Sequence, residues 1–178
     1  MLIPTQEAPD LLLPTLFHGE FNLKSERPKN FTMLIFFRGL HCPICTTYLK
    51  SFADLLPDFV ELGVTSIAIS SDGKKRALEM AKKVGSKSLR YGYNLKLKQA
   101  REWGLYISEG RGKTSAGVSE LDFFPEPGFF LVKPDDSIFY IATQSMPFAR
   151  PQFKDVLGSL RFILDKSYPA RGNIEYLP

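Results

Sequence analysis

The sequence predicts an α/β fold in which helices flank a central mixed β-sheet. Residues 33–37 and 64–70 are short, strongly apolar segments of the kind that form buried strands, and each precedes a segment with helical periodicity. A strand–helix–strand unit of this kind makes its two strands parallel. Residues 128–132 and 138–141 flank the turn sequence KPDDS, which predicts an antiparallel pair and therefore a mixed sheet.

Residues 1–32 are expected to form an extension ahead of the first buried strand. They are rich in proline, and apolar residues on both sides of His18, Gly19 and Glu20 predict a short β-hairpin. We expect this N-terminal hairpin to pack at the edge of the sheet.

Two predicted helices follow the two buried strands. Apolar residues between positions 49 and 59 recur at steps of three and four, so the first helix buries one face, and Pro57 is expected to kink it. Ser71 and Asp72 are predicted to cap the second helix, which runs through Val84.

The second half of the chain alternates shorter elements with one irregular segment. The patterns predict a short strand at 89–93, a helix at 97–103, a final helix within 150–164 and an extended tail at 166–178. Residues 108–125 have no periodic pattern, and irregular segments of that length are typical of lids over a functional site.

Composition indicates a single domain that spans residues 1–178. The chain has 178 residues, of which 44% are hydrophobic and 24% charged, enough to bury a sizeable core. Its first twenty residues lack the basic start of a signal peptide, and no apolar run reaches membrane-spanning length. We therefore expect a soluble, cytoplasmic protein that does not associate with membranes.

Basic residues are concentrated in 73–101, which holds ten lysines or arginines and a single acid, Glu79. No aromatic interleaving and no nucleic-acid motif accompany them, so solvated helix faces are favoured over a nucleic-acid surface. A docking surface for an acidic electron-donor protein is an intermediate interpretation.

The only two cysteines, Cys42 and Cys45, lie between the first buried strand and its helix. Pro43 suits the first position of that helix, which places Cys42 at the N-cap. The free N–H groups and positive dipole end of a helix lower a thiol pKa from about 8.5 into a range of roughly 3.5 to 7.5. We therefore predict that Cys42 is the reactive thiolate and that Cys45, one turn inward, attacks a sulfur already oxidised.

Two other interpretations of the cysteine pair are weaker. A structural zinc site needs four ligands, and the chain offers only His41 and His18 beside the two thiols, so neither a metal nor another cofactor is expected. An inert buried pair is unusual at a strand-to-helix turn. A redox-active pair is the favoured hypothesis.

The segment FFRGLHCPIC, residues 36–45, resembles the motif of the peroxiredoxin-like family, the alkyl hydroperoxide reductase and thiol-specific antioxidant group of thioredoxin-fold redoxins. Further along, EPGFFLVKPDDSIFY at 126–140 resembles the family's strand–turn–strand after its cis-proline. The segment MPFARPQFKDVLGSL at 146–160 resembles the turn and last helix that bring an arginine to the site. The resemblance thus covers most of the chain and implies a thioredoxin-like fold.

The resemblance implies a peroxidase activity that fits the thiol chemistry. Cys42 would attack a hydroperoxide to give a sulfenic acid, and Cys45 would condense with it to a disulfide. Arg150 would stabilise the thiolate and polarise the peroxide. The peptide bond between Glu126 and Pro127 would be cis and face the cysteines.

Two departures from the family keep other functions open. Typical members have a proline and a threonine or serine where this chain has Ile35 and Gly39, so the hydroxyl that helps to hold peroxide is absent. The C-x-x-C spacing is more usual in thioredoxins. The enzyme alternative is a thioredoxin-like thiol–disulfide oxidoreductase, and the non-enzyme alternative is a redox-sensing or binding module.

Further expectations concern neighbouring residues and partners. Arg38 is a second cation close to the thiols in sequence, and His41, if charged, would lower the pKa of Cys42. An external dithiol, either a thioredoxin- or glutaredoxin-like protein or a small thiol, would restore the cysteines. Redoxins of this group often dimerise, so a homodimer is a further expectation.

Overall fold

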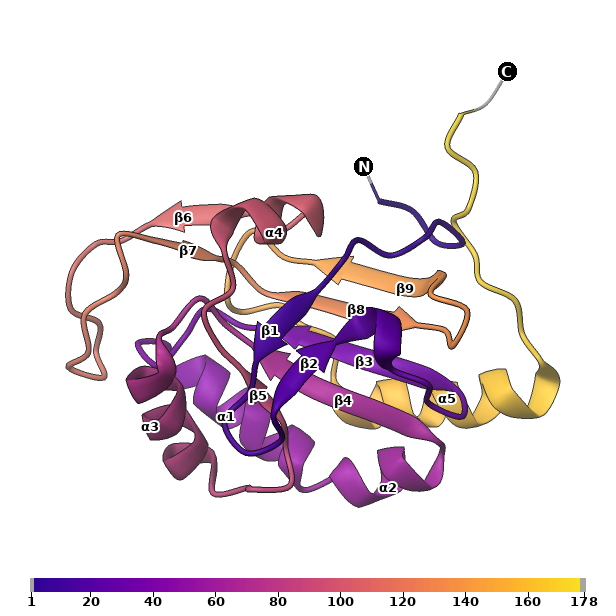
Figure 1. Ribbon diagram of the computed structural model, residues 1–178, viewed down its shortest axis with the longest axis horizontal. Helices are drawn as coiled ribbons and strands as arrows, with labels where there is room; N and C mark the ends of the chain where they lie inside the picture. The colour runs from indigo at the N-terminus through magenta and orange to yellow at the C-terminus, as the bar shows by residue number, and fades with distance from the viewer. Residues whose placement is uncertain (1, 177–178) are drawn as a thin grey trace.

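The computed structural model describes residues 2–176, and its centre is a five-stranded mixed sheet with the strand order β5-β4-β3-β8-β9 (Figure 1). The strands are β3 (Phe31–Phe36), β4 (Val64–Ile69), β5 (Tyr91–Gly92), β8 (Gly128–Val132) and β9 (Ile138–Thr143). Strand β3 is parallel to β4 and antiparallel to β8, and β8 is antiparallel to β9. The predicted mixed sheet is therefore confirmed.

Within residues 2–176, five α-helices pack around this sheet. They are α1 (Pro43–Ala53), α2 (Leu56–Glu61), α3 (Lys74–Val84), α4 (Leu97–Glu102) and α5 (Phe153–Lys166). The single kinked helix expected after the cysteines is two helices, because the chain turns at Asp54 and Leu55. Pro57 lies in the first turn of α2, where its missing N–H needs no intrahelical partner.

The sheet has a core on each face because successive residues of β3 point to opposite sides. Met33 and Ile35 face the larger core, which α1, α2, α3 and α5 cover. Leu34 and Phe36 face a second core, which also contains Trp103. Figure 1 shows these four helices on one side of the sheet and the N-terminal hairpin with α4 on the other.

The predicted N-terminal hairpin is present as β1 (Leu12–Pro14) and β2 (Glu20–Asn22), followed by a short 3-10 helix, η1 (Leu23–Ser25). It pairs with the edge strand β5, where the N–H of Leu16 donates to the carbonyl of Tyr91. Its apolar residues belong to the second core, so the segment from Ala8 to Leu23 covers a face of the sheet as well as its edge.

The segment expected to be irregular contains two short strands, β6 (Ile107–Glu109) and β7 (Phe123–Pro125), paired antiparallel. Each strand has only three residues, too few for an alternating pattern to be visible in the sequence. Between them, the chain from 110 to 122 forms a long loop at the left of Figure 1.

Two local expectations are wrong. Helix α3 begins at Lys74 with Gly73 as its N-cap, because the carboxylate of Asp72 instead accepts hydrogen bonds from other groups described below. The peptide bond between Glu126 and Pro127 is trans, since residues 2–176 contain no cis peptide bond. The N–H of Glu126 donates to the carbonyl of Tyr106, and the N–H of Gln144 donates to the carbonyl of Pro127. These hydrogen bonds hold the turn with its peptide bond trans, which is the intrinsically more stable isomer.

The chain after α5 agrees with the predicted tail as far as it is described. Residues 168–176 form no helix or strand, and Leu177 and Pro178 lie outside the described residues. Within residues 2–176, no helix is both long enough and apolar enough to cross a membrane.

The second core predicts a large loss of stability when one aromatic ring is removed. Phe130 is fully buried, and its ring centroid lies 4.9 Å from that of Trp103. We expect Phe130→Ala to lower the free energy of unfolding by about 3–5 kcal/mol. Phe148→Ala, at a side chain that is 68% exposed, is the control and should change it by less than about 0.5 kcal/mol. Urea titration followed by Trp103 fluorescence measures both values, and equal stability of the two variants would contradict the prediction.

Candidate functional site

The two cysteines lie where β3 passes into α1, next to the carboxyl end of β4. Cys42 is the N-cap of α1, as predicted, and the backbone N–H of Cys45 donates to its Sγ at 3.3 Å. The N–H of Cys42 donates to the carbonyl of Gly39 at 3.1 Å, which closes the turn. The local sequence therefore presents the sulfur of Cys42 to the free N–H groups of a helix start.

Cys42 is the more acidic thiol. A hydrogen bond from the thiol of Cys45 lowers the pKa of Cys42 from 9.0 to about 6, although burial acts in the opposite direction. The N–H of Cys45 and the charges of Arg150 and Arg38 contribute to this lowering of the Cys42 pKa. At neutral pH Cys42 is therefore mainly a thiolate, which is the nucleophilic form of cysteine.

Cys45 has the opposite character. Its side chain is completely buried, and this burial, together with the neighbouring Cys42, raises its pKa well above the usual range. Arg150 acts in the other direction. Both cysteines are free thiols. The pair thus combines one thiolate with one protonated thiol, the arrangement required for a nucleophile and a resolving cysteine.

Arg150 comes from the segment before α5 and contacts both sulfurs. Its Nη2 lies 3.2 Å from Sγ of Cys45 and 3.9 Å from Sγ of Cys42. Its Nε donates to the carbonyl of Pro147 at 2.7 Å, and its guanidinium lies over the ring of Tyr48, 5.0 Å from the centroid. Its Nη1 is buried without a hydrogen-bond partner among the described residues.

Arg38, the second predicted cation, is held on another side of the cysteine turn. Its Nη2 lies 3.2 Å from Glu120 and its Nε 3.3 Å from Glu126, and its guanidinium covers the ring of Phe124. Glu126 also accepts a hydrogen bond from Ser108 at 2.6 Å. Glu126 therefore orients Arg38, which influences Cys42 through its charge.

Pro127, the other predicted residue of that turn, lies on the Arg150 side of the site. With Tyr48 and Pro151 it lines a cavity of about 10 Å³ beside Arg150. A cavity of that size is large enough for about one water molecule.

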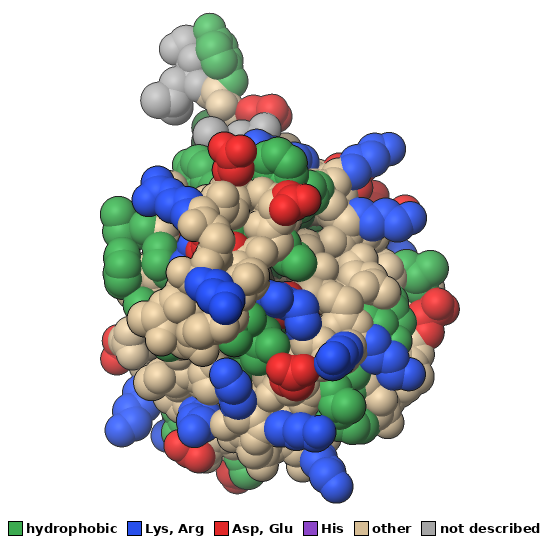
Figure 2. Space-filling view, turned by 90° about the vertical axis from the view of Figure 1, so that its left-hand side faces the viewer, with side chains coloured by type: hydrophobic (Ala, Val, Ile, Leu, Met, Phe, Trp, Pro, Cys, Tyr) green, Lys and Arg blue, Asp and Glu red, His purple; other side chains and the backbone are tan. Residues whose placement is uncertain are grey.

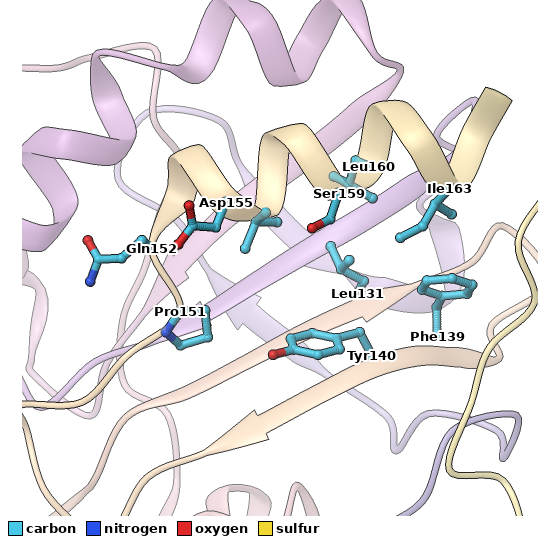
Figure 3. Close-up of a pocket in the computed structure, with 10 residues that line it drawn as sticks. Leu131, Phe139, Tyr140, Pro151, Gln152, Asp155, Ser159, Leu160 and Ile163 are labelled. Atoms are coloured by element: carbon cyan, nitrogen blue, oxygen red, sulfur yellow. The ribbon is translucent and has the colours of Figure 1, made fainter. Parts of the chain in front are cut away.

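An apolar groove adjoins the site through Pro151. Figure 3 shows the groove between α5 and the strands β8 and β9, with Pro151 and Gln152 at one end and Phe139 and Ile163 at the other. Its volume is about 400 Å³. Neither cysteine lines it, so the groove neighbours the thiol site without containing it.

His41 does not supply positive charge to Cys42. Its side chain is fully buried, and this burial, assisted by Arg38, lowers the pKa of His41 from 6.5 to about 4. Below neutral pH it stays uncharged until about pH 4, so the expected cationic role is wrong. Its ring packs on Phe124 at a centroid distance of 4.6 Å, and its carbonyl accepts a hydrogen bond from Thr114.

Asp72 is the residue of the site that sequence reasoning missed. It lies beyond the end of β4, is fully buried, accepts a hydrogen bond from the N–H of Leu40 at 2.7 Å and pairs with Arg76. Gly39 has φ +133, and a Cβ built on it would lie 2.7 Å from Oδ2 of Asp72. The carboxylate thus occupies the space that a side chain at position 39 would need. The signal in the sequence is an acid shortly beyond the strand β4, which pairs with the strand that leads to the cysteines.

The long loop between β6 and β7 is fastened to the cysteine turn. Thr114 donates to the carbonyl of His41 at 2.6 Å, Arg76 donates to the carbonyl of Ser119 at 2.9 Å, and Glu120 pairs with Arg38. The loop therefore covers the His41 side of the turn, as expected of a cover over the site.

Within the described chain, no group of three or more His, Cys, Asp or Glu side chains is placed to hold a metal ion. Figure 2 shows lysine and arginine side chains distributed over the left-hand face of Figure 1, some of them adjacent, with acidic, hydrophobic and tan surface between them.

The lowered pKa of Cys42 and the raised pKa of Cys45 predict how alkylation should depend on pH. Because Cys42 has a pKa of about 6, its iodoacetamide reaction should rise with pH and reach half its maximal rate near pH 6. Cys45→Ala removes the largest stabilising hydrogen bond and should move this midpoint upwards, whereas Cys45→Ser keeps a donor and should move it less. Intact mass measured against pH gives the midpoints, and an unshifted Cys45→Ala variant would contradict the assignment.

The contact between Gly39 and Asp72 predicts that a hydroxyl cannot simply be added at position 39. Gly39→Ser should lower the free energy of unfolding by about 1–3 kcal/mol for its backbone conformation, with a further loss for the contact with Asp72. The matched control is Gly85→Ser, at a glycine with φ +81 and no atom within 4 Å of an added Cβ. Denaturant unfolding of both variants should show the larger loss for Gly39→Ser, and equal losses would count against the role of Asp72.

Comparison with solved structures supports the fold. The chain is similar to peroxidoxin BcpB from Mycobacterium tuberculosis, with 19% identity, a TM-score of 0.69 and coverage of 92% of this chain and 99% of that one. It is also similar to the reduced 2-Cys peroxiredoxin of Plasmodium vivax, with 18% identity, a TM-score of 0.71 and coverage of 98% and 91%. A third similar structure is AhpC of Mycobacterium bovis, with 14% identity, a TM-score of 0.73 and coverage of 98% of this chain and 99% of that one.

Comparison of the sequence with known proteins gives two results. A search of curated proteins finds no significant match. The family described as the AhpC/TSA family matches residues 4–141, which include both cysteines, the whole central sheet except the end of β9, and the turn at Pro127. Because this match covers well over half of the chain, the protein belongs to the AhpC/TSA family.

Proposed function

We propose that the protein is a thiol peroxidase that reduces hydroperoxides with Cys42 and then closes a disulfide between Cys42 and Cys45. The observation that carries this proposal is the pairing of a thiolate at a helix start with a buried protonated thiol, both in contact with Arg150. Membership of the AhpC/TSA family supports the same chemistry.

The first step oxidises Cys42. Its thiolate attacks the terminal oxygen of the hydroperoxide, the O–O bond breaks, and Cys42 becomes a sulfenic acid while the substrate leaves as an alkoxide that takes up a proton to form the alcohol. The buried Nη1 of Arg150, which has no partner among the described residues, is a donor suited to an oxygen atom of the substrate. Arg38 supports the thiolate through its charge alone.

The second step closes the disulfide and the third reopens it. Cys45 loses its proton and attacks the sulfur of the Cys42 sulfenic acid, an S–S bond forms, and hydroxide leaves as water after protonation. An external dithiol, either a thioredoxin- or glutaredoxin-like protein or a small thiol, then reduces the disulfide and is itself oxidised. We place this cycle in the reducing cytoplasm, where such donors are available.

A second candidate function is thiol–disulfide exchange without peroxide. It is favoured by the contact between Gly39 and Asp72, because the space for a peroxide-holding hydroxyl is filled by a carboxylate. In this case Cys42 attacks a disulfide substrate and Cys45 releases it, so the same residues serve both reactions. A redox-sensing module would use the same thiols but turn over slowly.

The decisive experiment separates these functions by their oxidant. Wild type and Cys45→Ser are treated with one equivalent of hydrogen peroxide and followed by intact mass with thiol trapping, timed against free cysteine. We expect rapid sulfenic acid on Cys42 in the variant and an intramolecular disulfide in the wild type. Oxidation no faster than that of free cysteine, together with rapid exchange against a disulfide substrate, would instead establish the reductase.

A further inference from the structure

Arg150 lies closer to the resolving sulfur than to the attacking one. Its Nη2 is 3.2 Å from Sγ of Cys45 and 3.9 Å from Sγ of Cys42. The hydrogen bond from Nε of Arg150 to the carbonyl of Pro147 and the packing on the ring of Tyr48 hold the guanidinium in this place. The hydroxyl of Tyr48 in turn donates a hydrogen bond to the carbonyl of Pro151 at 2.7 Å. The shorter distance from Arg150 to Cys45 therefore belongs to a guanidinium that its neighbours hold in place.

The two sulfurs depend on Arg150 to different degrees. Negative charge on Cys42 is favoured by the thiol and the N–H of Cys45, and by the charges of Arg150 and Arg38. Cys45 is completely buried, and the one cation that favours its charged form among the described residues is Arg150. Loss of Arg150 removes one of several stabilising groups from Cys42 but the sole stabilising cation from Cys45.

The reaction sequence makes this difference important at the second step. While Cys42 is a thiolate, its negative charge opposes a second negative charge on Cys45. Oxidation of Cys42 to a neutral sulfenic acid removes that opposition. Arg150 then has a single sulfur to neutralise, and Cys45 must ionise to attack.

We infer that Arg150 is the shared counter-charge of the two steps and that its larger contribution is to disulfide closure by Cys45. This inference rests on the proposed thiol chemistry and deepens it. In the step concerned, Cys45 gives up its proton, its sulfur bonds to the sulfur of the Cys42 sulfenic acid, and the S–O bond breaks to release water. Arg150 donates to the sulfur that becomes negative, so ionisation of Cys45 follows oxidation of Cys42.

The test measures the two steps separately in variants of Arg150. Sulfenic acid formation is measured in a Cys45→Ser background with hydrogen peroxide, and disulfide closure is measured by quenched single turnover in chains that retain Cys45. We expect Arg150→Met to slow closure roughly tenfold more than it slows oxidation, a factor that corresponds to one pKa unit of the attacking thiol. Arg150→Lys, which keeps the charge, should recover part of closure.

Arg38→Gln is the contrasting variant, because Arg38 acts on Cys42 and not on Cys45. It should slow oxidation more than closure, the reverse of the order expected for Arg150→Met. Circular dichroism and Trp103 fluorescence check that each variant is folded. A second consequence is that Arg150→Met should accumulate sulfinic acid on Cys42 at excess peroxide, because its sulfenic acid persists for longer.

Equal slowing of the two steps in Arg150→Met, or a larger effect on oxidation, would overturn the inference. Failure of the proposed peroxidase function looks different, since the wild type itself would then react no faster than free cysteine. In that case the same variants are mixed with a small aromatic disulfide, which Cys42 attacks to form a mixed disulfide. The second step is then the attack of Cys45 on this mixed disulfide, which releases the aromatic thiol from Cys42. Unchanged release in Arg150→Met would then overturn the inference.

Discussion

The central physical constraint is that a negative charge must be held on a sulfur atom that has little contact with water. The Cys42 side chain is only 2% exposed, and burial alone would keep its thiol protonated. The helix start, the neighbouring thiol and the nearby arginines offset that penalty. The path of β3, the break before α1 and the position of the segment before α5 all serve to bring these groups to one point.

A network of charged side chains supports the cysteine turn on a different side from Arg150. Arg38 pairs with Glu120 and Glu126, and Asp72 pairs with Arg76. The three carboxylates are buried, whereas the side chains of Arg38 and Arg76 keep 17% and 24% exposure. Buried pairs of this kind are weak sources of net stability because desolvation offsets their attraction, but the loss of one partner is costly. Their effect is to specify one arrangement of the cysteine turn and of the loop that covers it.

The contact between Gly39 and Asp72 gives a structural reason why position 39 has no side chain. The carboxylate of Asp72, which lies beyond β4, fills the space next to Gly39 and accepts a hydrogen bond from the N–H of Leu40. Under the proposed mechanism, substrate oxygen atoms would be bound by other donors, such as the buried Nη1 of Arg150. The chain thus combines membership of the AhpC/TSA family with two cysteines placed within one turn at the start of α1.

Local patterns in the sequence predicted the sheet strands, the N-terminal hairpin and the place of Cys42 at a helix start, because hydrophobic periodicity and a proline after the cysteine act over a few residues. They did not reveal Asp72, the neutral state of His41 or the trans bond before Pro127, since each depends on neighbours brought from other elements. The sequence alone thus singled out the two thiols as candidate site residues, and its resemblance to the family added Arg150. Which sulfur Arg150 approaches more closely was decided by the tertiary structure, because that distance depends on how the segment before α5 packs against Tyr48 and α1.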